Sequence, residues 1–372
     1  MKFAVVEYTS KSGKIWKHQT DKPNYLADPA KEIDPTSFGC YVSALDGEHI
    51  PLKGIITGTA APVSWATVLS RRVYRKFLGH WPTTYDISYL LQFDILMVVH
   101  QFSDSHEMVS LLQRLRQHSP RPFLIGVPTQ PFGLLQNRLE ADVAANIDIR
   151  AHMDACDVFL TVVDSTLPAW QQKSTTPVVY MPQPYPVAFA SQYAKPQSQK
   201  KPILFVAGVT DRPNIALGHK VARKIQVKYP QYSIHVTDTP GHTQDLSGLA
   251  GGTFATQAFL PWQEQLQYLS QVSLVINTDY TRTRGRVQVD CAAVGTPAIG
   301  ADSDAQRDLF PDLFADQHTT ADELIAQAIR LLEDKDWYTE IAAKAKGRLE
   351  KYTYELSKQR IMALVEKYPQ GL

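Results

Sequence analysis

The sequence has little of what would place a protein in a membrane, in an oxidising compartment or on nucleic acid. Its three cysteines, Cys40, Cys156 and Cys291, are widely separated and lack metal-binding spacing, which predicts free thiols in a reducing compartment. No stretch approaches the roughly 18 consecutive apolar residues of a membrane-spanning helix, and the short apolar run at the N-terminus is not typical of a signal peptide. The net charge of +1 does not favour nucleic-acid binding. These absences predict a cytoplasmic protein.

Motifs for nucleotide cofactors and metals are also missing. Gly13-Lys14 is not a P-loop, because no glycine stands five residues earlier and no Ser or Thr follows. The glycines of 248–252 do not follow a strand at dinucleotide-binding spacing, so an NAD-dependent oxidoreductase is poorly supported. Asp302-Ser303-Asp304 has an Asp-x-Asp pattern, but its place after a strand favours a turn or a helix N-cap. We therefore predict no metal site and no resident cofactor.

What is present is an α/β pattern in a chain long enough for two domains, with 372 residues of which 44% are hydrophobic and 20% charged. Short apolar runs alternate with helical patterns of about 10 to 15 residues, which predicts parallel sheets with helices on both faces. The predicted strands are 3–6, 50–59, 93–101, 123–128, 158–163, 178–181, 202–207, 233–237, 274–276 and 298–299. The predicted helices are 107–117, 139–156, 215–229, 263–270, 287–294, 324–332 and 337–368. A capping box of Thr320 and Glu323 opens the helix 324–332, and the last helix is weakly interrupted at Gly347 and near Tyr352. Residues 17–50 show no pattern that assigns them.

A segment rich in proline, serine and glutamine marks the predicted domain boundary. Residues 182–201 hold four prolines and show no periodicity, which is typical of an interdomain linker. The predicted organisation is an N-terminal domain over 1–185, a linker over 186–200, a C-terminal domain over 201–350 and a C-terminal helix over 351–372.

The most informative stretch runs from Leu274 to Gly300. A buried strand leads into a loop with Arg282, Arg284 and Arg286, and a short helix follows Gly285. A helix N-terminus flanked by arginines suits an anion such as a diphosphate, because unpaired N–H groups and the helix dipole add to the side-chain charge. Asp290, about one turn into the helix, could accept hydrogen bonds from the vicinal hydroxyls of a ribose. The alternative interpretation is a solvated basic loop before a core helix.

This stretch resembles the donor site of retaining glycosyltransferases of the GT-B fold. In that family a Glu, three residues before a Gly and eight before a second Glu, opens a segment that ends in Ala-x-Gly-Thr-Pro-x-Ile. Here Gly285 fills the glycine position, residues 293–299 fill the ending, Asp290 replaces the second Glu and Arg282 replaces the first. The resemblance implies that Asp290 holds the nucleotide ribose. At the position that reaches the donor sugar, Arg282 inverts the charge.

The same resemblance implies a fold and an activity. The expected fold is two Rossmann-like domains facing across a cleft, with the C-terminal helix crossing back to the N-terminal domain. The expected function is transfer of a sugar from a nucleotide-sugar donor, bound by the C-terminal domain, to a glycan, lipid-linked or small-molecule acceptor. Retention of configuration without a metal is implied, with the nucleotide-sugar as co-substrate. Lipid-linked acceptors are common in the family and would bring the protein into peripheral membrane contact.

Further site residues follow from the family pattern. His100, at the end of a strand, would lie near the transferred sugar, although a histidine satisfied at a strand end is the alternative. Arg212 and Asn214 occupy the turn that meets the donor diphosphate in the family, and an exposed turn without a ligand is the alternative interpretation for Arg212. Arg284 and Arg286 would neutralise the diphosphate. Ser12, Gly13 and Lys14 form the loop expected on the acceptor side.

Two other functions remain open at this point. The chain could be a non-catalytic GT-B binding or scaffold protein in which Arg282 records lost chemistry. It could also be an enzyme of the same fold with different chemistry, such as a nucleotide-sugar epimerase. As a third hypothesis, Arg282 pairs with an acidic donor sugar or with a phosphorylated acceptor.

Overall fold

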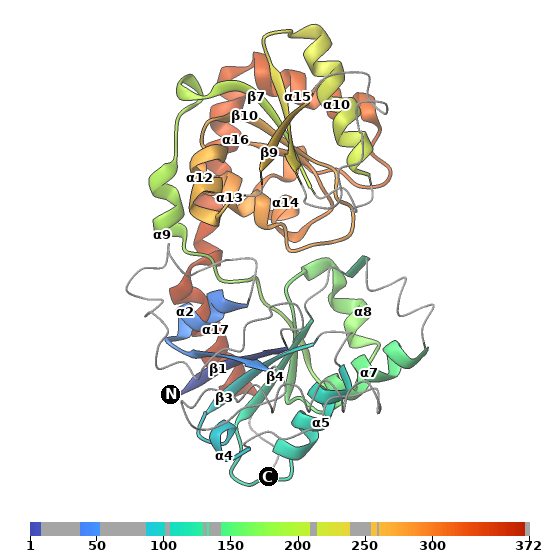
Figure 1. The fold of residues 1–372 in the computed structure, drawn as a ribbon, viewed down its shortest axis with the longest axis vertical. Coiled ribbons are helices and arrows are strands. Elements are labelled where there is room, and N and C mark those ends of the chain that lie inside the picture. The colour runs from blue at the N-terminus through green and yellow to red at the C-terminus, as the bar shows by residue number, and fades with distance from the viewer. Residues whose placement is uncertain are drawn as a thin grey trace, which may run out of the picture. The chain divides into compact units, whose positions relative to one another are not determined.

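The computed structural model places the chain in two compact units with parallel sheets (Figure 1). The residues that it describes are 1–8, 38–52, 87–100, 105–128, 132–133, 143–208, 214–238, 254–258 and 260–368. The first unit comprises Met1–Gln130, Leu134–Pro184 and Tyr354–Leu372, and the second comprises Pro131–Gly133 and Tyr185–Thr353.

The first unit is built on a parallel sheet of strand order β2-β1-β3-β4-β5-β6. Its strands are β1 (Phe3–Tyr8), β2 (Glu48–Leu52), β3 (Ile95–His100), β4 (Phe123–Pro128), β5 (Val158–Thr161) and β6 (Val178–Tyr180). Strands β3 and β4 are buried along their whole length. Both faces of a parallel sheet are covered by other elements, which explains why these two strands are continuous apolar runs in the sequence.

Alternate residues of these strands pack against different helices. Phe3 and Val5 of β1 join a core with helices α2 (Gly39–Leu45) and α17 (Tyr354–Lys367). Ala4 and Val6 join a second core with the helices α4 (Ile87–Leu90) and α5 (Ser105–Leu115). This division follows from the two-residue period of a strand. It also confirms that the C-terminal helix returns to the N-terminal part of the chain. Helices α7 (Val143–Asp154) and α8 (Leu167–Gln171) complete this unit's described helices outside short turns.

The second unit has the strand order β11-β10-β7-β8-β9, also parallel. Its strands are β7 (Lys201–Ala207), β8 (Ser233–Asp238), β9 (Ala255–Ala258), β10 (Val272–Asn277) and β11 (Ala298–Gly300). Its main helices are α10 (Ile215–Lys228), α12 (Trp262–Leu269), α13 (Arg286–Val294), α14 (Asp304–Leu309), α15 (Ala321–Glu333) and α16 (Lys335–Gly347). Helix α10 lies on one face of the sheet, and α12 with α13 lies on the other (Figure 1).

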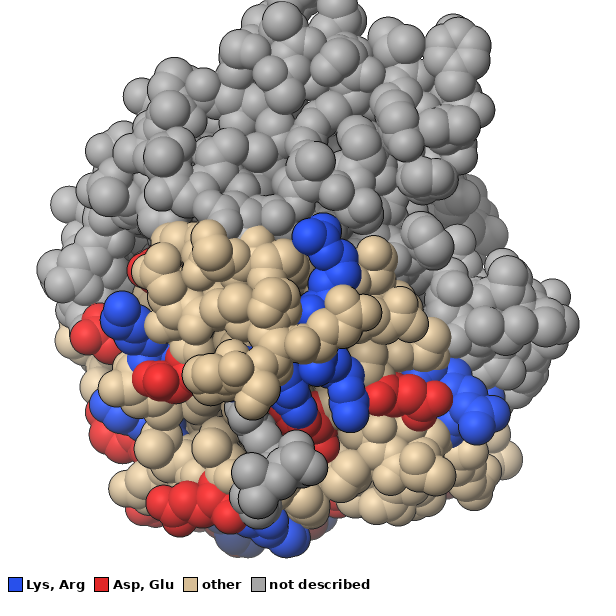
Figure 2. All heavy atoms as spheres, turned by 90° about the horizontal axis from the view of Figure 1, so that it is seen from below, with Lys and Arg blue, Asp and Glu red and all other residues tan. Residues whose placement is uncertain are grey.

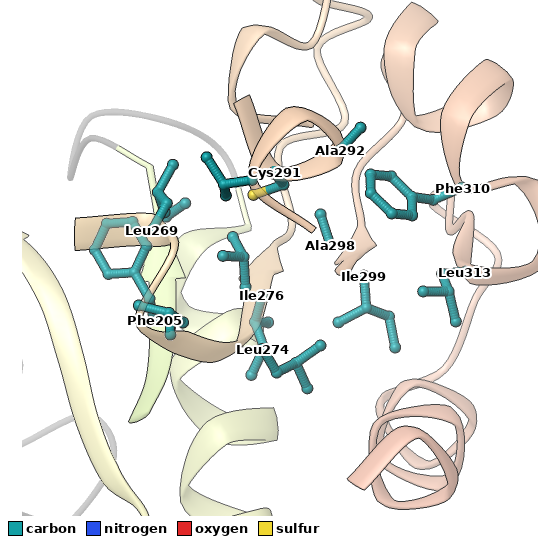
Figure 3. Close-up of a cluster of buried hydrophobic side chains, with 14 of the residues drawn as sticks. Phe205, Leu269, Leu274, Ile276, Cys291, Ala292, Ala298, Ile299, Phe310 and Leu313 are labelled. Atoms are coloured by element: carbon teal, nitrogen blue, oxygen red, sulfur yellow. The ribbon is translucent and has the colours of Figure 1, made fainter. Parts of the chain in front are cut away.

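The core of the second unit is apolar and continuous across β10, β11 and α13. Cys291 of α13 lies over Ile276 of β10 in Figure 3, which also shows Phe310 beside β11. The thiols of Cys40, Cys156 and Cys291 are free and buried, as expected for small apolar side chains in a core.

Three segments differ from their sequence-based assignment. Residues 186–200, predicted as a linker, form short helices, including α9 (Val187–Ala190), and Phe189 and Tyr193 pack on the core of the second unit. Helix α2 lies inside region 17–50, to which the sequence assigned no structure. Its seven residues are too few to show a helical period. Strand β2 covers only the first residues of the predicted strand 50–59, whose later residues lie outside the described part.

The start of α15 follows the capping chemistry that the sequence indicates. Thr320 and Glu323 form the predicted capping box at the start of α15. The long C-terminal helical pattern is interrupted where predicted, by the turn η7 (Arg348–Tyr352) between α16 and α17. None of the helices in the described ranges has the length and apolar character needed to span a bilayer. Basic and acidic side chains are interspersed on the face shown in Figure 2.

Gly300 gives a test of the junction between β10 and β11. Its φ of +101° is unfavourable for other residues, and a Cβ there would lie 2.0 Å from the carbonyl oxygen of Asn277. Gly300→Ala is expected to lower the unfolding free energy by at least about 2 kcal/mol in urea denaturation. Gly347→Ala is the matched control, because a Cβ there meets nothing within 4 Å. An equal effect of the two substitutions would contradict this packing.

Two buried histidines of the first unit predict a pH dependence of stability. The rings of His100 and His152 lie 4.8 Å apart, and burial lowers the pKa of His152 from 6.5 to about 4. Since the folded pKa lies below the unfolded value, the unfolded chain binds the proton more readily. The unfolding free energy should therefore fall by up to about 3 kcal/mol as pH drops from 6.5 to about 4.

Urea denaturation of the whole chain between pH 7 and pH 5 tests this dependence. His152→Gln is expected to reduce the slope of the unfolding free energy against pH. A variant with the same slope as the wild type would show that His152 does not contribute.

Candidate functional site

The second sheet has a topological reversal between β7 and β10. The chain leaves β7 towards β8 and β9 on one side, then returns to β10 and continues to β11 on the other side. β7 and β10 are hydrogen-bonded neighbours, with Ala207 opposite Asn277 at their carboxyl ends. In open α/β sheets this is where ligands bind. The loops that follow these two strand ends contain Asn214 and the arginine-rich stretch.

Two helices begin at this edge without a side-chain cap. The N-cap of α10 is Asn214 and the N-cap of α13 is Gly285, both in the left-handed region with φ of 70° and 81°. Neither helix has a side-chain hydrogen bond to its first-turn N–H groups at this cap. The Thr278 hydroxyl donates to the Asn214 carbonyl at 2.7 Å, which joins the two loops. An uncapped N-terminus leaves N–H groups and the positive end of the helix dipole for an anion.

The loop before α13 is held against the loop after β11 by backbone hydrogen bonds. Asp304 N–H donates to the Thr283 carbonyl at 2.9 Å, and Ala305 N–H donates to the Arg284 carbonyl at 3.1 Å. A Cβ at Gly285 would lie 2.5 Å from the Ser303 hydroxyl oxygen. Glycine at 285 is therefore required by space as well as by φ. The arginine loop is fixed in its backbone where it enters the helix.

Gln288 adds a functional candidate that the sequence reasoning missed. It lies in the first turn of α13 and is only 1% exposed. Its side-chain oxygen is 3.1 Å from the Cβ position of Gly285, so the amide lies against the helix start. Within the described residues its Nε2 has no hydrogen-bond partner. A buried amide donor without a partner suits a bound ligand acceptor. Its place three residues after Gly285 was the only available signal.

Asp290 is a buried anchor in this geometry. Its Oδ1 accepts from the Tyr185 hydroxyl at 2.6 Å and from the Trp262 indole N–H at 2.9 Å. Its Oδ2 lies 3.5 Å from Nε of Arg286, one turn earlier on the same helix. Burial raises the pKa of Asp290, and Arg286, Trp262 and Tyr185 oppose that rise. Both oxygens are engaged within the chain and the residue is 1% exposed, so this geometry does not support the expected contact with a ribose.

Arg282 pairs with an acid from the neighbouring loop. It has a φ of 53°, and its Nε lies 3.6 Å from Oδ2 of Asp302. Arg307 donates to the other oxygen of Asp302 at 3.0 and 2.8 Å and stacks over Phe314. Arg282 thus has the carboxylate of Asp302 close to it in space.

His100 lies at the end of β3, as the sequence predicts, and belongs to the first unit. It is buried, and its ring packs edge to face against His152. Burial lowers the pKa of His100 well below 6.5, and the neighbouring His152 lowers it further. A histidine with these surroundings is neutral at pH 7.

The remaining expected residues fall into two groups. Ser12, Gly13, Lys14 and Arg212 lie outside the described residues. Asn214, Arg282, Arg284, Gly285, Arg286 and Asp290 all belong to the second unit, at or after the carboxyl ends of β7 and β10. Asp302-Ser303-Asp304 is a helix start, because the Ser303 hydroxyl caps α14 by accepting from the N–H of Gln306. The described part of the chain holds no group of three His, Cys, Asp or Glu side chains suited to a metal.

Comparison with known proteins finds similarity in structure only. No family model and no curated protein matches the sequence. The α,α-trehalose 6-phosphate synthase of Burkholderia multivorans is similar with a TM-score of 0.64 at 13% identity, over 98% of each chain. HepE of Anabaena, solved with UDP-glucose, has a TM-score of 0.64 at 12% identity over 99% of this chain and 100% of its own.

A third solved structure, MnaA of S. aureus with UDP, has a TM-score of 0.54 at 13% identity over 99% of this chain and 96% of its own. Identities this low show the fold alone. The similar chains are GT-B nucleotide-sugar enzymes, and they share the two parallel-sheet units of this chain. The protein therefore has the GT-B fold that its arginine-rich stretch led us to expect.

Proposed function

We propose that the protein is a glycosyltransferase that binds a nucleotide-sugar at the carboxyl ends of β7 and β10. The observation that carries this proposal is the meeting of two uncapped helix N-termini, those of α10 and α13, at the reversal of strand order. Arg284, in the loop before α13, and Arg286, the first residue of that helix, supply positive charge at the same place. HepE and MnaA, which share the fold, were solved with UDP-glucose and UDP.

The diphosphate would lie against the start of α13. Arg284 and Arg286 flank Gly285 and would neutralise the charge that develops on the leaving diphosphate. Gln288 would donate its buried amide to a phosphate oxygen. Arg212 and Asn214 would serve the same group from the start of α10. No metal is required when arginines and helix N-termini carry this stabilisation.

Asp290 acts in this proposal by positioning Arg286. A buried carboxylate needs an opposite charge, and Arg286 supplies it from one turn away. The pairing fixes the guanidinium at the first residue of the helix. Tyr185 and Trp262 hold the carboxylate from two other segments, so the arginine is oriented before a ligand binds.

The first unit would bind the acceptor, which we propose to be a glycan, a lipid-linked sugar or a small molecule. His100, neutral at pH 7, would contribute hydrogen bonding near the transferred sugar. Retention of configuration remains part of the proposal through the family resemblance. An epimerase of the same fold would release an altered sugar nucleotide without any acceptor, so product analysis with and without acceptor separates the two chemistries.

Thermal unfolding with UDP, GDP, ADP, CMP and dTDP tests the binding site. A ligand at 100 times its dissociation constant should raise the unfolding free energy by about 2.7 kcal/mol, which gives a measurable rise in Tm. Arg284→Gln should lower the affinity for the nucleotide that stabilises the wild type by about tenfold, which is the effect of losing one charge-assisted hydrogen bond. Arg223→Gln, in the middle of α10, is the control with the same change of charge. If no nucleotide raises the Tm, the proposal is wrong.

A double-mutant cycle tests the positioning role of Asp290. Arg286→Gln and Asp290→Asn should each weaken nucleotide binding, by about tenfold or more for Arg286→Gln. The double variant should bind no more weakly than Arg286→Gln, because Asp290 acts through that arginine. Losses that add fully would show that Asp290 contributes independently. Unfolding measured on the same samples identifies any variant that fails to fold.

A further inference from the structure

Two arginines share the carboxylate of Asp302 unequally. Arg307 donates two hydrogen bonds to Oδ1, at 3.0 and 2.8 Å, and its guanidinium carbon lies 4.1 Å from the ring centre of Phe314. Arg282 approaches Oδ2 only to 3.6 Å, which is beyond hydrogen-bond distance. Its side chain is 44% exposed, whereas that of Asp302 is 10% exposed. Arg307 is therefore fixed, and Arg282 is held by electrostatic attraction alone.

The backbone beneath Arg282 is fixed as well. Thr281 donates its N–H and its hydroxyl to Oδ1 of Asp279, at 2.9 and 2.5 Å. The N–H of Asp302 donates to the Asp279 carbonyl at 3.0 Å, which joins the two loops. Arg282 itself sits at a φ of 53°, a conformation that arginine rarely adopts. The backbone position of this side chain is thus defined, three residues before Gly285, the N-cap of α13.

Two arginines depend on one carboxylate in this cluster, because Arg282 and Arg307 both pair with Asp302. Of the nearby acids, Asp279 turns one oxygen into its own loop, and Asp304 is buried at the start of α14. An exposed ion pair at 3.6 Å is weak and screened by solvent. A carboxylate or phosphate of a ligand can offer Arg282 two charge-assisted hydrogen bonds instead.

We propose that Arg282 recognises an anionic group, a carboxylate or a phosphate, on a sugar bound beside the diphosphate. The proposal rests on the nucleotide-sugar site proposed above and names its substrate class. Arg307 holds Asp302 in place, and Asp302 keeps Arg282 directed along its loop until the ligand anion replaces it. The anion belongs either to the sugar of the donor or to the sugar of the acceptor.

Binding measurements with the full-length protein distinguish these sources. UDP, UDP-glucose and UDP-glucuronate are titrated into the wild type, Arg282→Gln, Arg282→Lys and the control Arg223→Gln. For an anionic donor, UDP-glucuronate should bind at least about tenfold more tightly than UDP-glucose. Arg282→Gln should reduce that ratio to within about twofold. Arg282→Lys should keep part of it, Arg223→Gln all of it, and the affinity for UDP should stay unchanged in all variants.

For an anionic acceptor, UDP-glucuronate has no advantage, but glucose 6-phosphate binds the UDP-loaded protein and loses affinity in Arg282→Gln. The proposal is overturned if UDP-glucuronate binds no more tightly than UDP-glucose and glucose 6-phosphate binds no more tightly than glucose. It is also overturned if a preference survives in Arg282→Gln. If the wild type binds none of the UDP compounds, the nucleotide site itself fails and this inference falls with it. Normal UDP binding without any preference refutes the inference alone.

Discussion

A single buried carboxylate holds together the part of the second unit that carries the proposed site. Asp290 joins Tyr185 before α9, Trp262 at the start of α12 and Arg286 at the start of α13. A charge removed from water is costly unless an opposite charge and hydrogen bonds accompany it, and these three partners supply both. Folding of the unit therefore fixes the first residue of α13. The stability of the unit and the orientation of the proposed anion-binding end of α13 depend on the same network.

The backbone around this network is constrained by close approach. The loops after β10 and β11 are joined by hydrogen bonds, and Gly285 and Gly300 occupy positions where a Cβ would meet neighbouring atoms. Because the backbone of these loops has little freedom to rearrange, recognition of a ligand would depend on their side chains. Arg282 differs from its neighbours in this respect, since its only ion pair within the described residues is with Asp302, at 3.6 Å. A positive charge next to the proposed diphosphate site is what a sugar with an anionic group would require.

Much of the fold could be predicted from the sequence, because its signals are local. Apolar runs such as Ile95–His100 identify buried parallel strands, and the capping box at Thr320 locates the start of α15. The return of α17 to the first unit came from the family resemblance, and contacts with α2 confirm it. Helix α2 could not be predicted because it is short. The composition of segment 186–200 is typical of a linker, and it does not reveal that the aromatic residues of this segment pack on the core.

The site was less predictable, because side-chain partners distant in sequence determine it. Gly285 and the arginine loop could be found from spacing. The hydrogen bonds that Asp290 accepts from Tyr185 and Trp262 could not be predicted, since those partners lie 105 and 28 residues away in the sequence. The pairing of Arg282 with Asp302 likewise depends on the register of two loops. Gln288 looks like an ordinary helical residue until its burial is known.

The most direct test of the account is hydrogen–deuterium exchange of the full-length protein with and without a saturating nucleoside diphosphate. The account predicts slower exchange in the segments 214–218 and 277–290, where the helix N-termini of α10 and α13 would donate N–H groups to the phosphates. Binding with protection confined to the first unit, or with none at the start of α13, would contradict it.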